Sequence, residues 1–145
     1  MLKKTITFTD YFGETRTQDF YFNLSKAELL DMNYTTVGGM QRMVEEIQNS
    51  QDQKRIYELF KTIVLKAYGE KSADGYRFIK SPEISEAFSQ TEAYSELMME
   101  FFSKENAAAD FIMGIVPADL RDEAQKQAAK QGITGVISGE PKPIE

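Results

Sequence analysis

The feature that most constrains the fold of this chain is one amphipathic stretch, residues 52–68. Its apolar residues recur at intervals of three and four, as the buried face of a helix requires. They are Ile56, Leu59, Phe60, Ile63, Val64 and Ala67. Gly69 follows where a left-handed helix cap costs least. The sequence therefore predicts a central helix whose apolar face the rest of the chain must cover.

Residues 2–23 have the pattern of a β-hairpin. Ile6 and Phe8 alternate with threonines, the same alternation returns before residue 23, and Gly13 can take the positive φ that a turn needs. A hairpin alone is marginally stable in water, so one face must pack on helices or one edge must pair with another chain. The residues expected at a self-association edge are Thr5, Thr7 and Thr9.

Capping signals divide residues 25–117 into helices. Ser25 with Glu28 forms one capping box, and Ser50 with Gln53 forms another at the start of the central helix. Further starts are expected after Thr36, at Ser81 and at Thr91, while Ser103 either caps a last helix or marks a kink. The helix after Thr91 has an apolar face formed by Tyr94, Leu97, Met98, Phe101 and Phe102. The pair Gly38-Gly39 weakens the first turn of the helix that follows Thr36, and residues 70–80 read as a polar loop.

The expected fold class is α-dominated α+β. The N-terminal hairpin packs on a bundle of about five or six helices, and residues 1–117 form a single compact domain. Residues 118–145 form a polar, helix-prone segment and a flexible tail, which either binds a partner on demand or is a plain tail.

Composition excludes several functions. The 145 residues include no Cys and no His, so disulfides, thiolate chemistry and the usual catalytic triads are impossible. A net charge of −6 disfavours nucleic-acid binding. No apolar run approaches the roughly 18 residues that span a bilayer, and the first residues do not resemble a signal peptide, so we expect a cytoplasmic protein without a membrane partner.

Two side-chain patterns are candidates for a site. Glu92, Glu96 and Glu100 lie at i, i+4 and i+8, on one face of a helix. They form either a metal or acid–base site or a solvated helix face, and we interpret them as a solvated face. We therefore predict no enzyme activity, no metal and no cofactor.

The methionines are the second pattern. Methionine adapts to variable partners, but it also fills gaps in cores. The candidate partner-binding residues are Met40, Met43, Met98 and Met99.

Charge is unevenly distributed along the chain. Residues 52–80 hold seven basic and four acidic residues, whereas residues 81–110 hold seven acidic residues and one lysine. Opposite charges of this kind either steer head-to-tail self-association or lie on two helix faces that meet within one fold.

Several phrases resemble the tail assembly chaperones of long-tailed, siphovirus-type phages and prophages of Gram-positive bacteria. The resemblance covers about residues 1 to 120. It is carried by LKKTITFTDY at 2–11, FYFNLSKAEL at 20–29, AYGEKS at 67–72 and SEAFSQTEAY at 85–94. These phrases are typical of the family and contain no catalytic signature.

The resemblance implies a function in tail assembly. Such proteins coat the long, apolar, helical tape measure protein, keep it soluble and help to recruit tail tube subunits. They act in the host cytoplasm and are absent from the mature virion. Many also occur in a longer, frameshifted form. The implied partners are the tape measure protein, the tail tube protein, the longer form and further copies of the chain as a homo-oligomer. The alternative function is a structural tail completion or connector subunit that stays in the virion.

Overall fold

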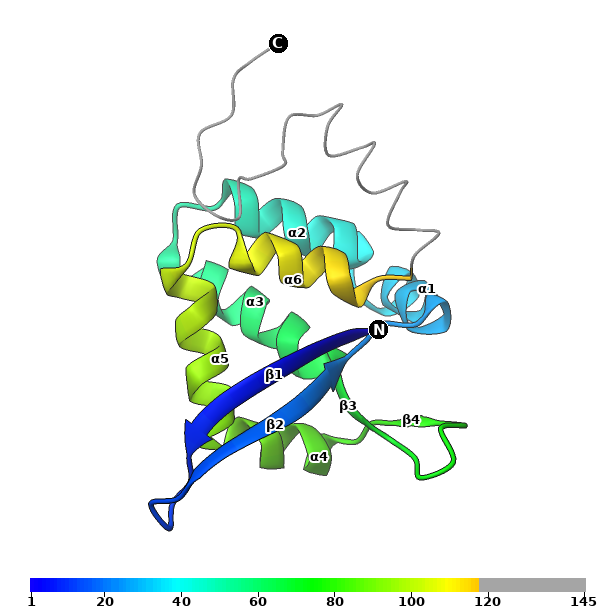
Figure 1. Ribbon diagram of the computed structural model, residues 1–145. Helices are drawn as coiled ribbons and strands as arrows, with labels where there is room; N and C mark the ends of the chain where they lie inside the picture. The colour runs from blue at the N-terminus through cyan, green and yellow to red at the C-terminus, as the bar shows by residue number, and fades with distance from the viewer. Residues whose placement is uncertain (118–145) are drawn as a thin grey trace.

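The structure is a computed structural model that describes residues 1–117; the predicted flexible tail at 118–145 lies outside the described residues. Within these residues, six helices pack against a four-stranded antiparallel sheet (Figure 1). The strands are β1 (Leu2–Thr9), β2 (Thr15–Phe22), β3 (Tyr68–Lys71) and β4 (Phe78–Ile79). The helices are α1 (Lys26–Thr35), α2 (Gly39–Asn49), α3 (Gln53–Ala67), α4 (Pro82–Ser89), α5 (Glu92–Ser103) and α6 (Ala107–Ile115). The expected α+β class is confirmed.

The N-terminal hairpin forms as predicted and opens the sheet, whose order is β1-β2-β3-β4. Its turn is set by Asp10 and Gly13. Asp10 N–H donates to Glu14 O at 2.8 Å, Gly13 N–H donates to Asp10 O at 2.9 Å, and Gly13 has φ 86°. The left-handed glycine closes the turn, and the strands then pair with Thr9 opposite Thr15.

The polar loop predicted at residues 70–80 is present only at residues 72–77, because the ends of this segment belong to two strands. Tyr21 and Phe22 of β2 pair with Gly69 and Tyr68 of β3, and β3 turns back into β4. Gly69 is therefore not the cap of α3; Tyr68 is, in extended conformation. A Cβ at Gly69 would lie 2.6 Å from the Phe78 ring, so glycine is required there by the close approach of β4.

Three helix starts follow the predicted capping chemistry. Ser25 and Glu28 form the expected box, and Ser81 and Thr91 accept from the backbone of their own helices. At α3 the prediction was wrong, because the Asp52 carboxylate, and not Ser50, accepts from Lys54 N–H and Arg55 N–H. The negative charge of Asp52 also favours the positive end of the helix dipole.

The starts of α2 and α6 have no side-chain cap. They begin after Gly38 and Asn106, both in the left-handed conformation. Ser103 does not cap α6, because it is the last residue of α5.

Gly38 and Gly39 form the turn between α1 and α2, with φ of 77° and 62°. They do not merely weaken a helix start, because the chain reverses direction at left-handed positions that other residues rarely adopt. We expect Gly39→Ala to destabilise the fold by about 1–3 kcal/mol. Besides the unfavourable φ, the added Cβ would lie 2.1 Å from the Asn33 side-chain oxygen. Urea denaturation measures this loss; Gly75→Ala is the control for φ alone, since nothing lies within 4 Å of its Cβ.

The core is built on the predicted face of α3. Five of its residues are buried, and Phe60 makes edge-to-face contact with Phe101 at 5.0 Å. Phe22 of β2 is fully buried, and its ring contacts Tyr68, Phe88 and Phe111 at 5.2–5.8 Å. The sheet and the helices thus share one aromatic cluster.

Lys80 joins three separate segments from a half-buried position. Its ammonium donates to Asn23 O at 2.6 Å, Glu28 Oε2 at 2.6 Å and Lys66 O at 2.9 Å, which uses all three of its protons. Burial lowers the pKa of Lys80 despite the pairing with Glu28. Burial alone would raise the pKa of Glu28, but hydrogen bonds from Lys80 and Ser25 hold it below its usual value.

Lys80→Ala is expected to destabilise the fold by about 2 kcal/mol, because two backbone carbonyls and a carboxylate lose their donor. Thermal denaturation measures the effect. Lys61→Ala on the exposed face of α3 is the matched control and should leave the melting temperature nearly unchanged. Equal effects of the two substitutions would contradict this role of Lys80.

Candidate functional site

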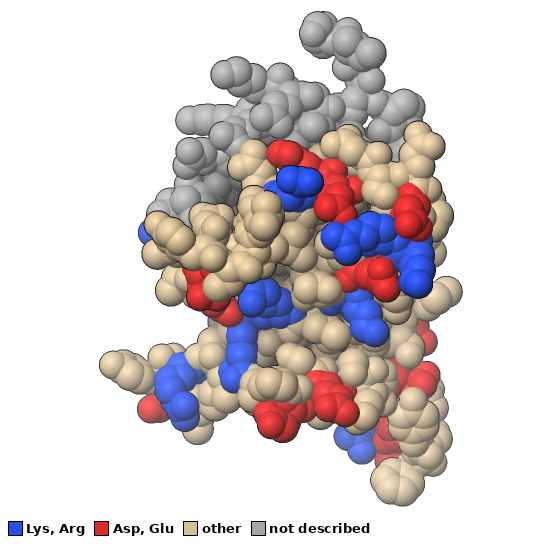
Figure 2. All heavy atoms as spheres, turned by 180° about the vertical axis from the view of Figure 1, so that it is seen from behind, with Lys and Arg blue, Asp and Glu red and all other residues tan. Residues whose placement is uncertain are grey.

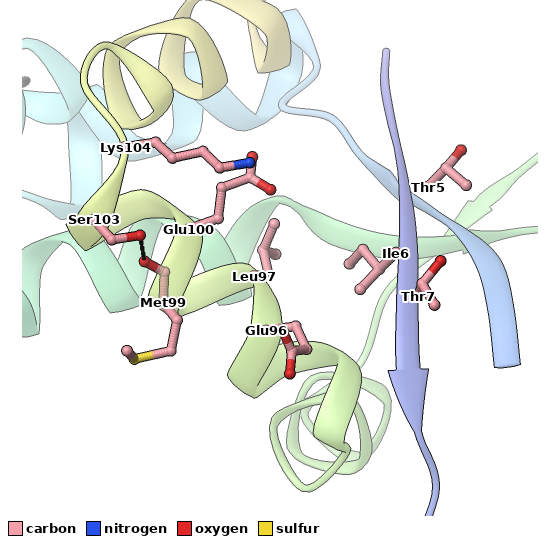
Figure 3. Close-up of a pocket in the computed structure, with 9 residues that line it drawn as sticks. All are labelled: Thr5, Ile6, Thr7, Glu96, Leu97, Met99, Glu100, Ser103 and Lys104. Atoms are coloured by element: carbon pink, nitrogen blue, oxygen red, sulfur yellow. Dashed lines mark hydrogen bonds between the residues drawn. The ribbon is translucent and has the colours of Figure 1, made fainter. Parts of the chain in front are cut away.

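A surface pocket of about 270 Å³ lies between β1 and α5. Its wall is formed by Thr5, Ile6 and Thr7 of β1, and its floor by residues of α5 and by Lys104, which follows it (Figure 3). Ile6 and Leu97 point toward one another beneath it, whereas the Thr5 and Thr7 side chains point away from α5 (Figure 3). The floor residues are Glu96, Leu97, Met99, Glu100, Ser103 and Lys104.

β1 is an edge strand, and its outer edge faces this pocket. In an antiparallel ladder, hydrogen-bonded pairs alternate with non-hydrogen-bonded pairs. Asp10 and Glu14 are hydrogen-bonded to each other. The non-hydrogen-bonded pairs are therefore Thr9–Thr15, Thr7–Thr17 and Thr5–Asp19. The backbone N–H and C=O groups of Thr5, Thr7 and Thr9 therefore point away from β2. Within residues 1–117, no hydrogen bond to these outward groups closes the edge. The three residues predicted as a self-association edge thus lie on a strand edge open to solvent.

A row of carboxylates on α5 runs beside β1. Glu100 pairs with Lys4 at 2.6 Å, and Glu92 accepts from the Tyr11 hydroxyl at 2.7 Å. The hydrogen bond to Glu92 raises the pKa of Tyr11, with smaller effects from desolvation and from the charge of Glu92. Glu96, between them, is exposed. The three glutamates thus lie on a surface, where two of them tie α5 to the hairpin.

An exposed apolar strip continues from the pocket across α5 to α3. It consists of Met99, Phe102 and Tyr57, which are 68%, 54% and 42% exposed. Met99 and Phe102 are neighbours one helical turn apart, and the Phe102 and Tyr57 rings lie 5.9 Å apart. Because contiguous apolar surface marks protein-binding sites, this strip is the candidate site for a partner chain.

Of the four methionines predicted to bind a partner, only Met99 is exposed. Met40, Met43 and Met98 are 9%, 7% and 8% exposed and belong to the core. In this conformation they fill gaps among helices, and they reach a partner only if the core opens. Adjacent positions on a helix point about 100° apart, so Met98 and Met99 take opposite roles.

The strip was not predicted from the sequence, because the apolar pattern placed Phe102 on the buried face of α5. Five apolar positions cover more of the helix circumference than one neighbour can bury. A second surface was also missed: Leu30, Tyr34 and Val37, around the end of α1, are 58%, 84% and 85% exposed. The sequence could have indicated this surface, because the apolar residues of α1 lie on all sides of the helix and one neighbour cannot bury them all.

Charge is mixed on the side of the molecule opposite the view of Figure 1. Figure 2 shows basic and acidic side chains interspersed there. By contrast, α5 carries three glutamates and no basic residue. α5 itself is therefore acidic, although Lys4 and Lys104 lie close to its glutamates.

A small α+β domain with an open strand edge and an exposed apolar strip has the features of a protein that binds other protein chains. The chain matches the phage tail assembly chaperone family over residues 1–141 and belongs to that family. Assembly chaperones are non-catalytic factors that act in the phage-infected cell. No curated protein and no solved structure matched the chain. None of the helices in residues 1–117 is long and apolar enough to span a membrane.

Proposed function

We propose that this chaperone binds the tape measure protein, keeps it soluble and promotes assembly of the tail tube around it. The observation that carries the proposal is the apolar strip of Met99, Phe102 and Tyr57 at the surface of a family member. An apolar helix needs a complementary apolar surface to stay in solution, and a strip formed by two neighbouring helices can receive the apolar face of a third.

The remaining partners and the setting belong to the same proposal. The tail tube protein and a frameshifted longer form are further partners, copies of the chain associate through the Thr5–Thr9 edge, and the protein works in the host cytoplasm of a siphovirus-type phage. Nucleic acid, membranes and cofactors have no part in it. An assembly factor of this kind leaves the particle when assembly ends.

Particle composition tests the proposal against the alternative of a structural subunit. Mass spectrometry of infected lysate and of purified particles should find the chain in the lysate and not in the particles. A stoichiometric amount in purified virions would contradict the chaperone function and favour a tail completion or connector subunit. Tail tube protein, measured in the same samples, is the control for recovery of particles.

A further inference from the structure

The sheet has a second open edge, at β4, on the opposite side from β1. Ser72 N–H donates to Arg77 O at 2.9 Å, so these two residues form a hydrogen-bonded pair. The next pair, Lys71 and Phe78, is therefore a non-hydrogen-bonded pair. The backbone N–H and C=O groups of Phe78 therefore point away from β3. In the described part of the chain, neither sheet edge is covered by another strand.

We propose that copies of this chain join head to tail, with β4 of one copy pairing antiparallel to β1 of the next. The inference rests on the self-association in the proposed function and gives it a geometry. Its test needs no tape measure protein, although Met99 borders both the pocket and the apolar strip. An added strand at the β1 edge would occupy the pocket and lie on α5, whose exposed side chains form its floor.

The two edges match in direction. All neighbouring strands are antiparallel, so in a sheet of four strands β4 runs opposite to β1. An antiparallel junction between β4 and the next β1 therefore leaves every copy pointing the same way. Such a contact is heterologous, and without closure it repeats along an open rod. This is the geometry that coating a long, thin client needs.

The side chains also match. Tyr21 and Lys71 share the outer face of the sheet, with the Lys71 ammonium 4.0 Å from the Tyr21 ring, and Phe78 lies opposite Lys71. Because strand side chains alternate, Arg77 and Ile79 belong to the inner face, as Ile6 does. At the junction they would meet the pocket floor of the next copy, with Arg77 near Glu96 and Ile79 near Met99.

Charge favours this arrangement over a two-fold pairing of β1 with β1. A two-fold pairing would bring α5 against α5. Glu100 is paired with Lys4, but the carboxylates of Glu92 and Glu96, which have no ion pair within residues 1–117, would then face a second set. The head-to-tail junction instead brings an exposed arginine to an exposed glutamate. Within residues 1–117, the Arg77 guanidinium and the Glu96 carboxylate form no ion pair.

Sedimentation velocity of the purified full chain over a range of concentrations tests the proposal. The wild type should form a ladder of growing species. Arg77→Glu and Glu96→Arg should each weaken association by about tenfold or more, since like charges then meet. The double variant Arg77→Glu/Glu96→Arg restores an opposite pair at every junction and should recover association. Thr7→Pro removes an outward N–H and should weaken association while circular dichroism shows an intact fold.

Lys54→Glu is the matched control, because it reverses one exposed charge on α3, away from both edges. It should leave association unchanged. A wild type that stays monomeric, or stops at a closed dimer, would overturn the proposal. So would a double variant that associates no better than its parents. No client is present in these measurements, so a monomeric chain that still solubilises the tape measure protein would overturn this inference alone.

Discussion

Replacing Met99 and Phe102 together by glutamate is expected to weaken tape measure binding by about 100-fold or more. Both side chains are more than half exposed, so the fold should tolerate the change, but each new carboxylate would be buried unpaired against an apolar client. Pull-down of the tape measure protein by purified variants, with circular dichroism of each variant, measures the effect.

The matched control is Leu30→Glu/Tyr34→Glu, which makes two similar changes on the second exposed apolar surface, at α1. It should bind the client as the wild type does. If the α1 variant loses the client and the α5 variant keeps it, the client surface lies at α1, and the strip is not the binding site.

Phe22→Ala is expected to cost about 3–5 kcal/mol of folding free energy, the largest loss among the substitutions considered. The Phe22 ring is fully buried and lies where β2, β3, α4 and α6 meet, so its removal leaves a cavity that no single element can fill. Urea denaturation followed by far-UV circular dichroism measures the change.

Phe12→Ala is the control for this substitution, because Phe12 is 91% exposed at the tip of the β1–β2 turn. It deletes the same ring with little change in stability expected. A Phe22→Ala protein as stable as Phe12→Ala would contradict the central position of Phe22 in the aromatic cluster.

Elements coded by local chemistry were predictable from the sequence. The Ser25–Glu28 box, the Ser81-Pro82 start and the apolar face of α3 each depend on residues within a few positions of one another, and all of them form. The turn at Gly13 followed for the same reason. Such signals act before any long-range contact is made.

Elements that depend on distant contacts were not predictable. β3 is a strand because Tyr68 and Gly69 pair with Phe22 and Tyr21 of β2, and Gly69 is needed because Phe78 packs over it. No sequence pattern within residues 68–71 indicates either contact. An expectation of a capping glycine was reasonable from neighbours alone, and tertiary pairing overrode it.

The candidate site shows the same limit. The methionines and the edge threonines were chosen from the sequence by residue type and alternation, but only packing decides that Met98 is buried and Met99 exposed. Met99 lies near Thr5 and Thr7 around one pocket, although α5 and β1 are far apart in the sequence. Periodicity within one helix carries no information about such a juxtaposition.

The most direct test of the proposed function is the soluble fraction of the tape measure protein when it is expressed with and without this chain. We expect the client to be soluble only in co-expression and to co-purify with many copies of the chaperone. The Met99→Glu/Phe102→Glu variant should leave it insoluble. A client whose solubility is the same with and without the chaperone would contradict the proposed function.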